Sequence, residues 1–200
     1  MSYSIIGSGS VGVALARQFA RNAIPVGIAN TRGPQSMDAV ASELGDQVVP
    51  MTLQEALRAD VILLAVPFRA HRDVAGALVS WAGKVVIDVT NAYGVPLSEL
   101  DQLPSSAVVA KALPGAHLVK AFNHLPAAVL AQEPAGHGGR RVIFVSGDDD
   151  GATGQVAALV ERLGFAPVAL GKIAEGGRLV QARDKTWAPL IFQDLFKKQA

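Results

Sequence analysis

Residues 4–12 read Ser-Ile-Ile-Gly-Ser-Gly-Ser-Val-Gly, and this stretch decides the fold. An apolar strand signal ends at the first glycine, and helical spacing of apolar residues begins within the motif. In a G-x-G-x-x-G motif so placed, the first glycine permits a tight turn, the second admits a pyrophosphate and the third lets the helix pack closely. The helix N-terminus adds free N–H groups and a positive dipole end. The stretch therefore predicts a dinucleotide cradle made of Gly7, Ser8, Gly9, Ser10, Val11 and Gly12.

Short β-branched runs alternate with longer amphipathic segments along the rest of the chain. The apolar pattern predicts strands at 4–6, 25–29, 47–49, 61–66, 84–89, 119–122, 141–145 and 166–170. It predicts helices at 11–22, 34–44, 53–58, 70–81 and 149–163, and a loop-rich segment at 91–118. Residues 61–66 are apolar without alternation, which is typical of a parallel strand covered on both faces. This order predicts an α/β fold: a Rossmann-type doubly wound parallel sheet with a small C-terminal α/β lobe.

The chain length suits one sizeable core with a small appendage. We expect a dinucleotide-binding domain over residues 1–123, and a small α/β lobe with its packed tail over 124–200. The Pro- and Gly-rich segment 133–139 reads as a surface loop. Because a chain of this size has difficulty covering so many apolar side chains in one short tail, we expect a homodimer through Trp187, Leu190, Ile191, Phe192, Leu195 and Phe196.

The composition argues against several classes of partner. The chain has 18 Lys and Arg against 17 Asp and Glu, a balance that disfavours nucleic acid or an anionic membrane as the main partner. It has no cysteine, and its four histidines lack metal-ligand spacing, so we expect no metal site. No leader pattern and no apolar run of membrane-spanning length is present, so we expect a cytoplasmic protein.

The end of the second predicted strand indicates which dinucleotide binds. An NAD site would place an acid about 20 residues past the glycine motif to accept from the ribose 2′-OH. Here the sequence reads Asn30-Thr31-Arg32, and no acid occurs before Asp38. Asn30 does not repel a 2′-phosphate, Thr31 can donate to it, and Arg32 can hold it with a charge-assisted pair. The predicted cofactor is NADP(H).

Two polar residues have alternative interpretations. Asp88, at the end of a predicted strand, either lines the ligand crevice or organises the following loop. His124 either approaches the nicotinamide or has a structural role, solvated or hydrogen-bonded. No residue is assigned as a catalytic acid or base, so the catalytic residues stay unknown.

At this point the motifs resemble a family. The glycine motif, Asn30-Thr31-Arg32, Ala65-Val66-Pro67, Asp88-Val89-Thr90-Asn91 and Lys120-Ala121-Phe122-Asn123 occur in the order and spacing of the NADPH:deazaflavin (coenzyme F-420) oxidoreductases. The segments Gly147-Asp148-Asp149, Leu163-Gly164-Phe165 and Leu170-Gly171 are similar to the same family's C-terminal part. The cytosolic domains of six-transmembrane metalloreductases resemble this family too.

The resemblance implies roles for individual residues. Thr31 and Arg32 would hold the 2′-phosphate, and Val66 and Pro67 would line the adenine–ribose side. Approach to the nicotinamide is implied for Asn91, Ala121 and Asn123, with the C-terminal segment closing over the ring of an acceptor.

The resemblance also implies hydride transfer between NADP(H) and a small-molecule redox acceptor such as a deazaflavin or a flavin. Such a reaction needs little beyond positioning, because the cofactors carry the reactive atoms. The alternatives are reduction of a small carbonyl or imine, and an NADPH-sensing protein without turnover.

Overall fold

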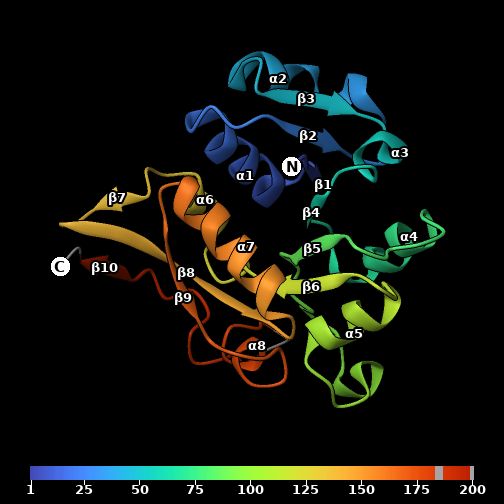
Figure 1. The fold of residues 1–200 in the computed structure, drawn as a ribbon, viewed down its shortest axis with the longest axis vertical. Helices are drawn as coiled ribbons and strands as arrows, with labels where there is room; N and C mark the ends of the chain where they lie inside the picture. Colours follow the sequence, from blue (N-terminus) through green and yellow to red (C-terminus); the bar gives the residue numbers. More distant parts are fainter. Residues whose placement is uncertain (183–186, 199–200) are drawn as a thin grey trace.

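The fold is built around one sheet with helices on both faces (Figure 1). The structure, a computed structural model, describes residues 1–182 and 187–198. The strands are β1 Tyr3–Ile6, β2 Val26–Ala29, β3 Val48–Met51, β4 Val61–Leu64, β5 Val85–Asp88, β6 His117–Lys120, β7 Ala135–Gly136, β8 Gly139–Gly147, β9 Ala166–Ala169 and β10 Phe196–Lys198.

Helices connect most of these strands. The α-helices are α1 Ser10–Arg21, α2 Asp38–Leu44, α3 Leu53–Ala56, α4 His71–Gly76, α5 Ser105–Ala112, α6 Ala127–Leu130, α7 Asp150–Arg162 and α8 Gly176–Leu179. Short 3₁₀ turns are η1 Pro34–Met37, η2 Phe68–Ala70 and η3 Leu97–Leu100.

The first six strands run parallel in the order β3-β2-β1-β4-β5-β6. This order is that of a Rossmann fold, so the predicted doubly wound sheet is confirmed. The chain reverses its direction of travel across the sheet between β1 and β4. In open α/β sheets, ligands bind at the carboxyl ends of the strands beside such a switch point.

Both faces of the sheet are covered, and β4 shows this best. Val61 and Leu63 pack in one core with residues of α1 and α7, whereas Ile62 and Leu64 pack in a second core with residues of α4 and α5. All four side chains are at most 1% exposed. An apolar run without alternation is therefore the pattern that this position requires, as the sequence predicted.

The sheet departs from the all-parallel prediction at its last strands. β8 pairs antiparallel with β6, and only Val119 and Lys120 of β6 have partners on β8, Gly147 and Ser146. The earlier residues of β8 continue past the carboxyl end of β6. On this overhang β8 pairs with β9, β10 and β7, and Figure 1 shows it reaching away from the parallel strands. The C-terminal lobe thus continues the main sheet.

Two local predictions also need correction. The segment expected to be loop-rich contains α5 and η3, and the helix expected at 70–81 is limited to α4. The C-terminal tail adds a strand, β10, which pairs with β8. α5 begins at Ser105 and consists mostly of small apolar residues, so it lacks the contrast between an apolar and a polar face that reveals an amphipathic helix.

A buried ion pair joins the ends of β5 and β6. Lys120 Nζ lies 3.2 Å from Asp88 Oδ2, and both side chains are completely buried. Ser106 Oγ of α5 donates to the same carboxylate oxygen, and the backbone N–H and hydroxyl of Thr90 donate to the other. Lys120 also donates to the carbonyl of Thr90 at 3.0 Å. Of the two interpretations of Asp88, the geometry fits the one in which it organises the loop.

The charge state of this cluster follows from its contacts. Burial alone raises the pKa of the Asp88 carboxyl, but the Lys120 ammonium and the donors of Ser106 and Thr90 outweigh burial and leave the pKa below its usual value. A carboxylate with a lowered pKa stabilises the fold above its unfolded-state pKa, and that contribution is lost as pH falls through its folded-state pKa.

We predict that Lys120→Met lowers the free energy of unfolding by roughly 3–5 kcal/mol near neutral pH, because Asp88 then stays buried without its counter-charge. In this variant burial raises the pKa of Asp88, so the deficit should begin to shrink as pH falls through this raised pKa, above the ordinary value of about 4, and shrink further below it. Urea unfolding of both proteins at neutral and at acidic pH measures this difference in the free energy of unfolding.

Lys111→Met, at an exposed lysine of α5, is the matched control and should change stability little. The double variant Lys120→Met/Asp88→Asn should recover most of the loss, because it leaves no buried charge. Equal losses for the single and double variants would contradict the ion-pair account.

Candidate functional site

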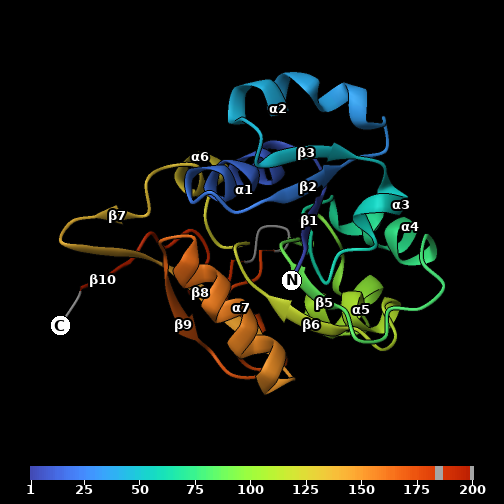
Figure 2. The ribbon, with the colours of Figure 1, turned by 45° about the horizontal axis from the view of Figure 1, so that its top comes forward.

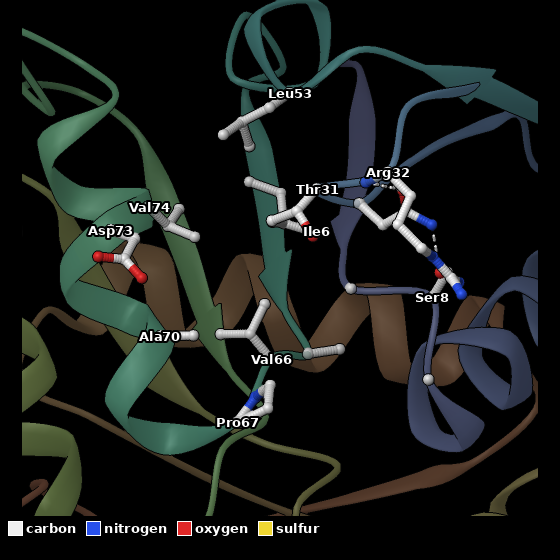
Figure 3. Close-up of a pocket in the computed structure, with 14 residues that line it drawn as sticks. Ile6, Ser8, Thr31, Arg32, Leu53, Val66, Pro67, Ala70, Asp73 and Val74 are labelled. Atoms are coloured by element: carbon white, nitrogen blue, oxygen red, sulfur yellow. Dashed lines mark hydrogen bonds between the residues drawn. The ribbon is translucent and has the colours of Figure 1, made fainter. Parts of the chain in front are cut away.

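A cavity of about 410 Å³ opens at the switch point between β1 and β4 (Figure 3). Its size is in the usual range for a small-molecule site. The turn after β1, the loop after β2 and the loop after β4 each contribute to its lining. Eight of the residues proposed from the sequence line it: Gly7, Ser8, Gly9, Asn30, Thr31, Arg32, Val66 and Pro67.

Two glycines of the motif are required by the protein's own packing. Gly7 has a φ of +116°, and a Cβ there would lie 2.1 Å from the carbonyl oxygen of Ala65. A Cβ on Gly12 would lie 1.9 Å from the carbonyl oxygen of Gly7. Any larger residue at these two positions would push the turn away from β4 or push α1 away from β1. They fix the helix at the switch point.

Gly9 has a different explanation. Its φ is −74°, a conformation open to any residue, and a Cβ built there meets no atom of the protein within 4 Å. Packing within the chain therefore does not require a glycine. A pyrophosphate bound against this backbone would require a glycine here, because a side chain would occupy the same space. The residues present fit the phosphates of a dinucleotide at Gly9.

The N-terminus of α1 beside Gly9 suits an anion. No side chain caps this helix, and its first turn contains no acid. The free N–H groups and the positive dipole end face the same loop. Ser10 and Val11 begin the helix and Gly12 is buried within it, so these three shape the turn and do not line the cavity.

Asn30 organises the loop after β2. Its amide nitrogen donates to Ser8 Oγ at 2.7 Å and to Ser36 Oγ at 2.9 Å. Its carbonyl oxygen accepts from the backbone N–H of Arg32 at 2.8 Å. One side chain thus ties the glycine turn to the loop that carries the arginine. An aspartate here would lack the amide donor and would add a negative charge to the cavity wall.

Arg32 and Thr31 are exposed at the rim of the cavity. Figure 3 shows the Arg32 side chain on the side of Ser8. No ion pair holds its guanidinium within the part of the chain that the structure describes. The geometry therefore leaves a cationic group at the position where the 2′-phosphate of NADP would distinguish it from NAD.

The opposite wall adds residues that sequence reasoning missed. Val66 and Pro67 lie at its base, as expected, but Leu53 at the start of α3 and three residues of the α4 region complete it: Ala70, Asp73 and Val74. The spacing i, i+3, i+4 puts these three on one helical face, so the pattern after Pro67 could have indicated them. The wall is apolar except for Asp73.

The residues expected near the nicotinamide lie outside this cavity. The Asn123 amide donates to Asn91 Oδ1 at 2.9 Å and to the carbonyl of Val180, and Asn91 donates to the backbone carbonyl of Asn123 at 2.8 Å. Asn91 Oδ1 also accepts from Ala182 N–H. Ala121 is completely buried. The pair thus anchors the chain after α8 to the ends of β5 and β6, and the nicotinamide assignment stays a prediction.

The histidines have structural surroundings. His124 is completely buried against Phe144, with ring centroids 4.8 Å apart, and burial lowers its pKa to about 4. It is therefore neutral at neutral pH, and neither ring nitrogen has a partner among the described residues. The surroundings of His124 are thus structural and buried rather than solvated. The His71 ring pairs through Nδ1 with the Phe68 carbonyl.

Residues 1–182 and 187–198 contain neither a candidate metal cluster nor a candidate membrane-spanning helix. No group of three or more His, Cys, Asp or Glu side chains there could hold a metal ion. No helix among these residues is both long and apolar enough to cross a membrane.

Known proteins similar to this chain include NADP oxidoreductases, which agrees with a dinucleotide site at the cavity. Residues 2–92 match the family model described as NADP oxidoreductase, coenzyme F420-dependent. A hypothetical protein from Sinorhizobium meliloti is 42% identical, with 98% of this chain and 96% of that chain covered and a TM-score of 0.92. A candidate f420 dependent nadp-reductase from Arthrobacter sp. FB24 has 24% identity, 86% coverage of both chains and a TM-score of 0.72, which supports the fold.

Metalloreductase STEAP3 of Rattus norvegicus is 28% identical over 173 residues, 85% of this chain. The chain spans 34% of the length of that relative. The family match covers β1, β2, β4 and the glycine turn, the same elements that build the cavity. Over residues 2–92, therefore, the chain matches the NADP oxidoreductase family.

Proposed function

We propose that the protein transfers a hydride between NADP(H) and a flat ring acceptor such as a deazaflavin (coenzyme F-420) or a flavin. The observation that carries the proposal is the cavity at the switch point, where Gly9 leaves room for a pyrophosphate and Arg32 offers a cation beside it. A bound NADPH supplies the hydride, and the chain supplies position.

Selection of NADP(H) over NAD(H) rests on the loop after β2. Its three residues 30–32 carry one positive and no negative charge. Asn30 fixes the backbone of Arg32 by a hydrogen bond, so the loop is organised before a nucleotide binds. Such preorganisation lowers the entropy cost of holding a phosphate. Thr31 adds a hydroxyl donor at the same rim.

The choice of a ring acceptor rests on the surroundings of the histidines. Reduction of a ketone needs a proton donor within hydrogen-bond reach of the oxygen that develops charge. His124 is buried and neutral, and the His71 ring is held by the Phe68 carbonyl, so neither is disposed to donate. A conjugated ring takes a hydride and can draw any proton from solvent, which these residues permit.

We also propose that the acceptor ring stacks on the C-terminal side of the nicotinamide, near Asn91 and Asn123. These two amides hold the chain at Val180 and Ala182 against the ends of β5 and β6. Rigid anchoring of this kind suits hydride transfer, because the reaction depends on holding two rings in a near-attack geometry.

We predict that Arg32→Ala weakens NADPH binding by roughly 10- to 150-fold, because one charge-assisted contact to the 2′-phosphate is lost. NADH binding should stay almost unchanged. Titration of both nucleotides against both proteins measures the effect. Arg178→Ala, at an exposed arginine of α8, is the matched control and should bind NADPH as the wild type does. Equal losses for NADPH and NADH would refute the 2′-phosphate assignment.

We predict direct transfer to the acceptor. With NADPH deuterated at C4, the label should appear on the ring carbon of a deazaflavin rather than in water. His124→Gln should lower turnover by far less than the roughly 10²- to 10⁴-fold that loss of a general acid would cost. Mass spectrometry of the product and steady-state kinetics are the two measurements.

Three outcomes would contradict the proposed hydride transfer. Loss of turnover in His124→Gln with NADPH affinity retained would favour reduction of a small carbonyl or imine. NADPH binding without oxidation by deazaflavin, flavin or ferric chelates would favour a sensor. Label lost to water from a deazaflavin acceptor would exclude direct transfer.

We further propose a homodimer through the C-terminal tail. The structure buries Ile191 but leaves Trp187 51% exposed and Leu195 43% exposed, and Trp187 packs edge-on against Phe192 and Tyr93. Exposed apolar patches of this kind mark interfaces.

We predict that Trp187→Ser/Leu195→Ser converts a dimer into a monomer in sedimentation velocity. Point changes are preferable to truncation, because β10 pairs with β8 and removal of the tail would disturb that sheet. The matched control is Val79→Ser, at an exposed apolar residue away from the tail. A monomeric wild type would refute the prediction.

A further inference from the structure

The cavity contains one feature that phosphate binding does not explain. Asp73 is the single acid among its lining residues. A carboxylate near a 2′-phosphate or a pyrophosphate would repel it. An acid in this wall therefore needs a partner in the ligand that is not a phosphate.

The position of Asp73 limits what that partner is. Figure 3 shows Asp73 and Arg32 on opposite sides of the cavity, with Val66 between and below them. Asp73 lies in the first turn of α4 and is exposed, and the neighbouring Arg69 pairs with Glu99 at 2.9 Å rather than with Asp73. Asp73 thus lies at the end of the cavity lining farthest from the arginine.

The walls around Asp73 fit a flat apolar ring. Val74, Ala70, Leu53 and Val66 provide apolar surface on the same side of the cavity. An adenine ring fits such walls by its faces and presents an amino group at its edge. A carboxylate is acceptor-only, so it pairs with an amino donor and not with a carbonyl.

We propose that the Asp73 carboxylate accepts a hydrogen bond from the exocyclic amino group of the adenine of NADP(H), and that it thereby selects adenine among purine dinucleotides. This inference rests on the proposed NADP(H) site. Hypoxanthine carries a carbonyl oxygen where adenine carries the amino group, so the same carboxylate repels it.

The test compares NADPH with reduced nicotinamide hypoxanthine dinucleotide phosphate, which has the same phosphates. The wild type should bind NADPH about tenfold more tightly, the lower end for a hydrogen bond to a charged group because Asp73 is exposed. In Asp73→Asn the two affinities should become nearly equal, because an amide can accept from the amino group or donate to the carbonyl.

The ratio of the two affinities separates recognition from simple charge. Removing one negative charge strengthens binding of both nucleotides alike, so a purely electrostatic role would leave the ratio unchanged. Asp46→Asn, at an exposed acid outside the cavity lining, removes the same charge and should keep the tenfold ratio.

Each outcome has a separate meaning. A wild type that binds both nucleotides equally overturns the adenine contact while the NADPH site stands. Discrimination that survives in Asp73→Asn shows that another group reads the amino group. Failure of the wild type to bind either nucleotide overturns the proposed function itself.

Discussion

The close approach of the glycine turn to β4 is the constraint on which the site depends. The Cα of Gly7 lies against the carbonyl of Ala65, and the Cα of Gly12 lies against the carbonyl of Gly7. These two contacts set α1 directly on β1 and leave its N-terminus at the switch point. The loops after β2 and β4 then frame a cavity around that helix end (Figure 2 shows α1 between β3 and the C-terminal lobe). With a side chain at either position, the anion-binding end of the helix would move away from both loops.

Polar contacts in the site divide between those that build it and those left for a ligand. The side-chain amide of Asn30 donates to Ser8 and Ser36 and accepts from the backbone N–H of Arg32, so it holds the loop together. Asp88 is likewise satisfied by Lys120, Ser106 and Thr90. Arg32 and Asp73 remain at the cavity surface with opposite charges on opposite sides. In the proposed NADP(H) site, this arrangement would favour one orientation of the ligand, because the reverse orientation would put a phosphate against the carboxylate.

The sequence alone predicted the parts of the fold whose signals are local. The glycine motif, the apolar run at 61–66 and the neutral-then-basic loop at 30–32 depend on a few adjacent residues, and the structure assembles them in one cavity. α5 was missed because its small apolar residues give weak periodicity. The antiparallel pairing of β8 was missed because direction is decided by distant contacts, here Val119 and Lys120 with Gly147 and Ser146. The spacing of Ala70, Asp73 and Val74 groups them on one helical face, but the sequence does not show that this face meets the loop after β4.

The overhang of β8 has a consequence for divergence. The parallel strands and the nucleotide cavity lie on one side of the β6–β8 pairing, and β7, β9, β10 and the tail are carried on the other by a single strand. Within the sheet, changes in β7, β9 or β10 therefore break no strand pairing of β1 to β6. The cavity beside β1 and β4 and the strands beyond β8 thus share few sheet pairings, so a change on one side can leave the pairings of the other in place.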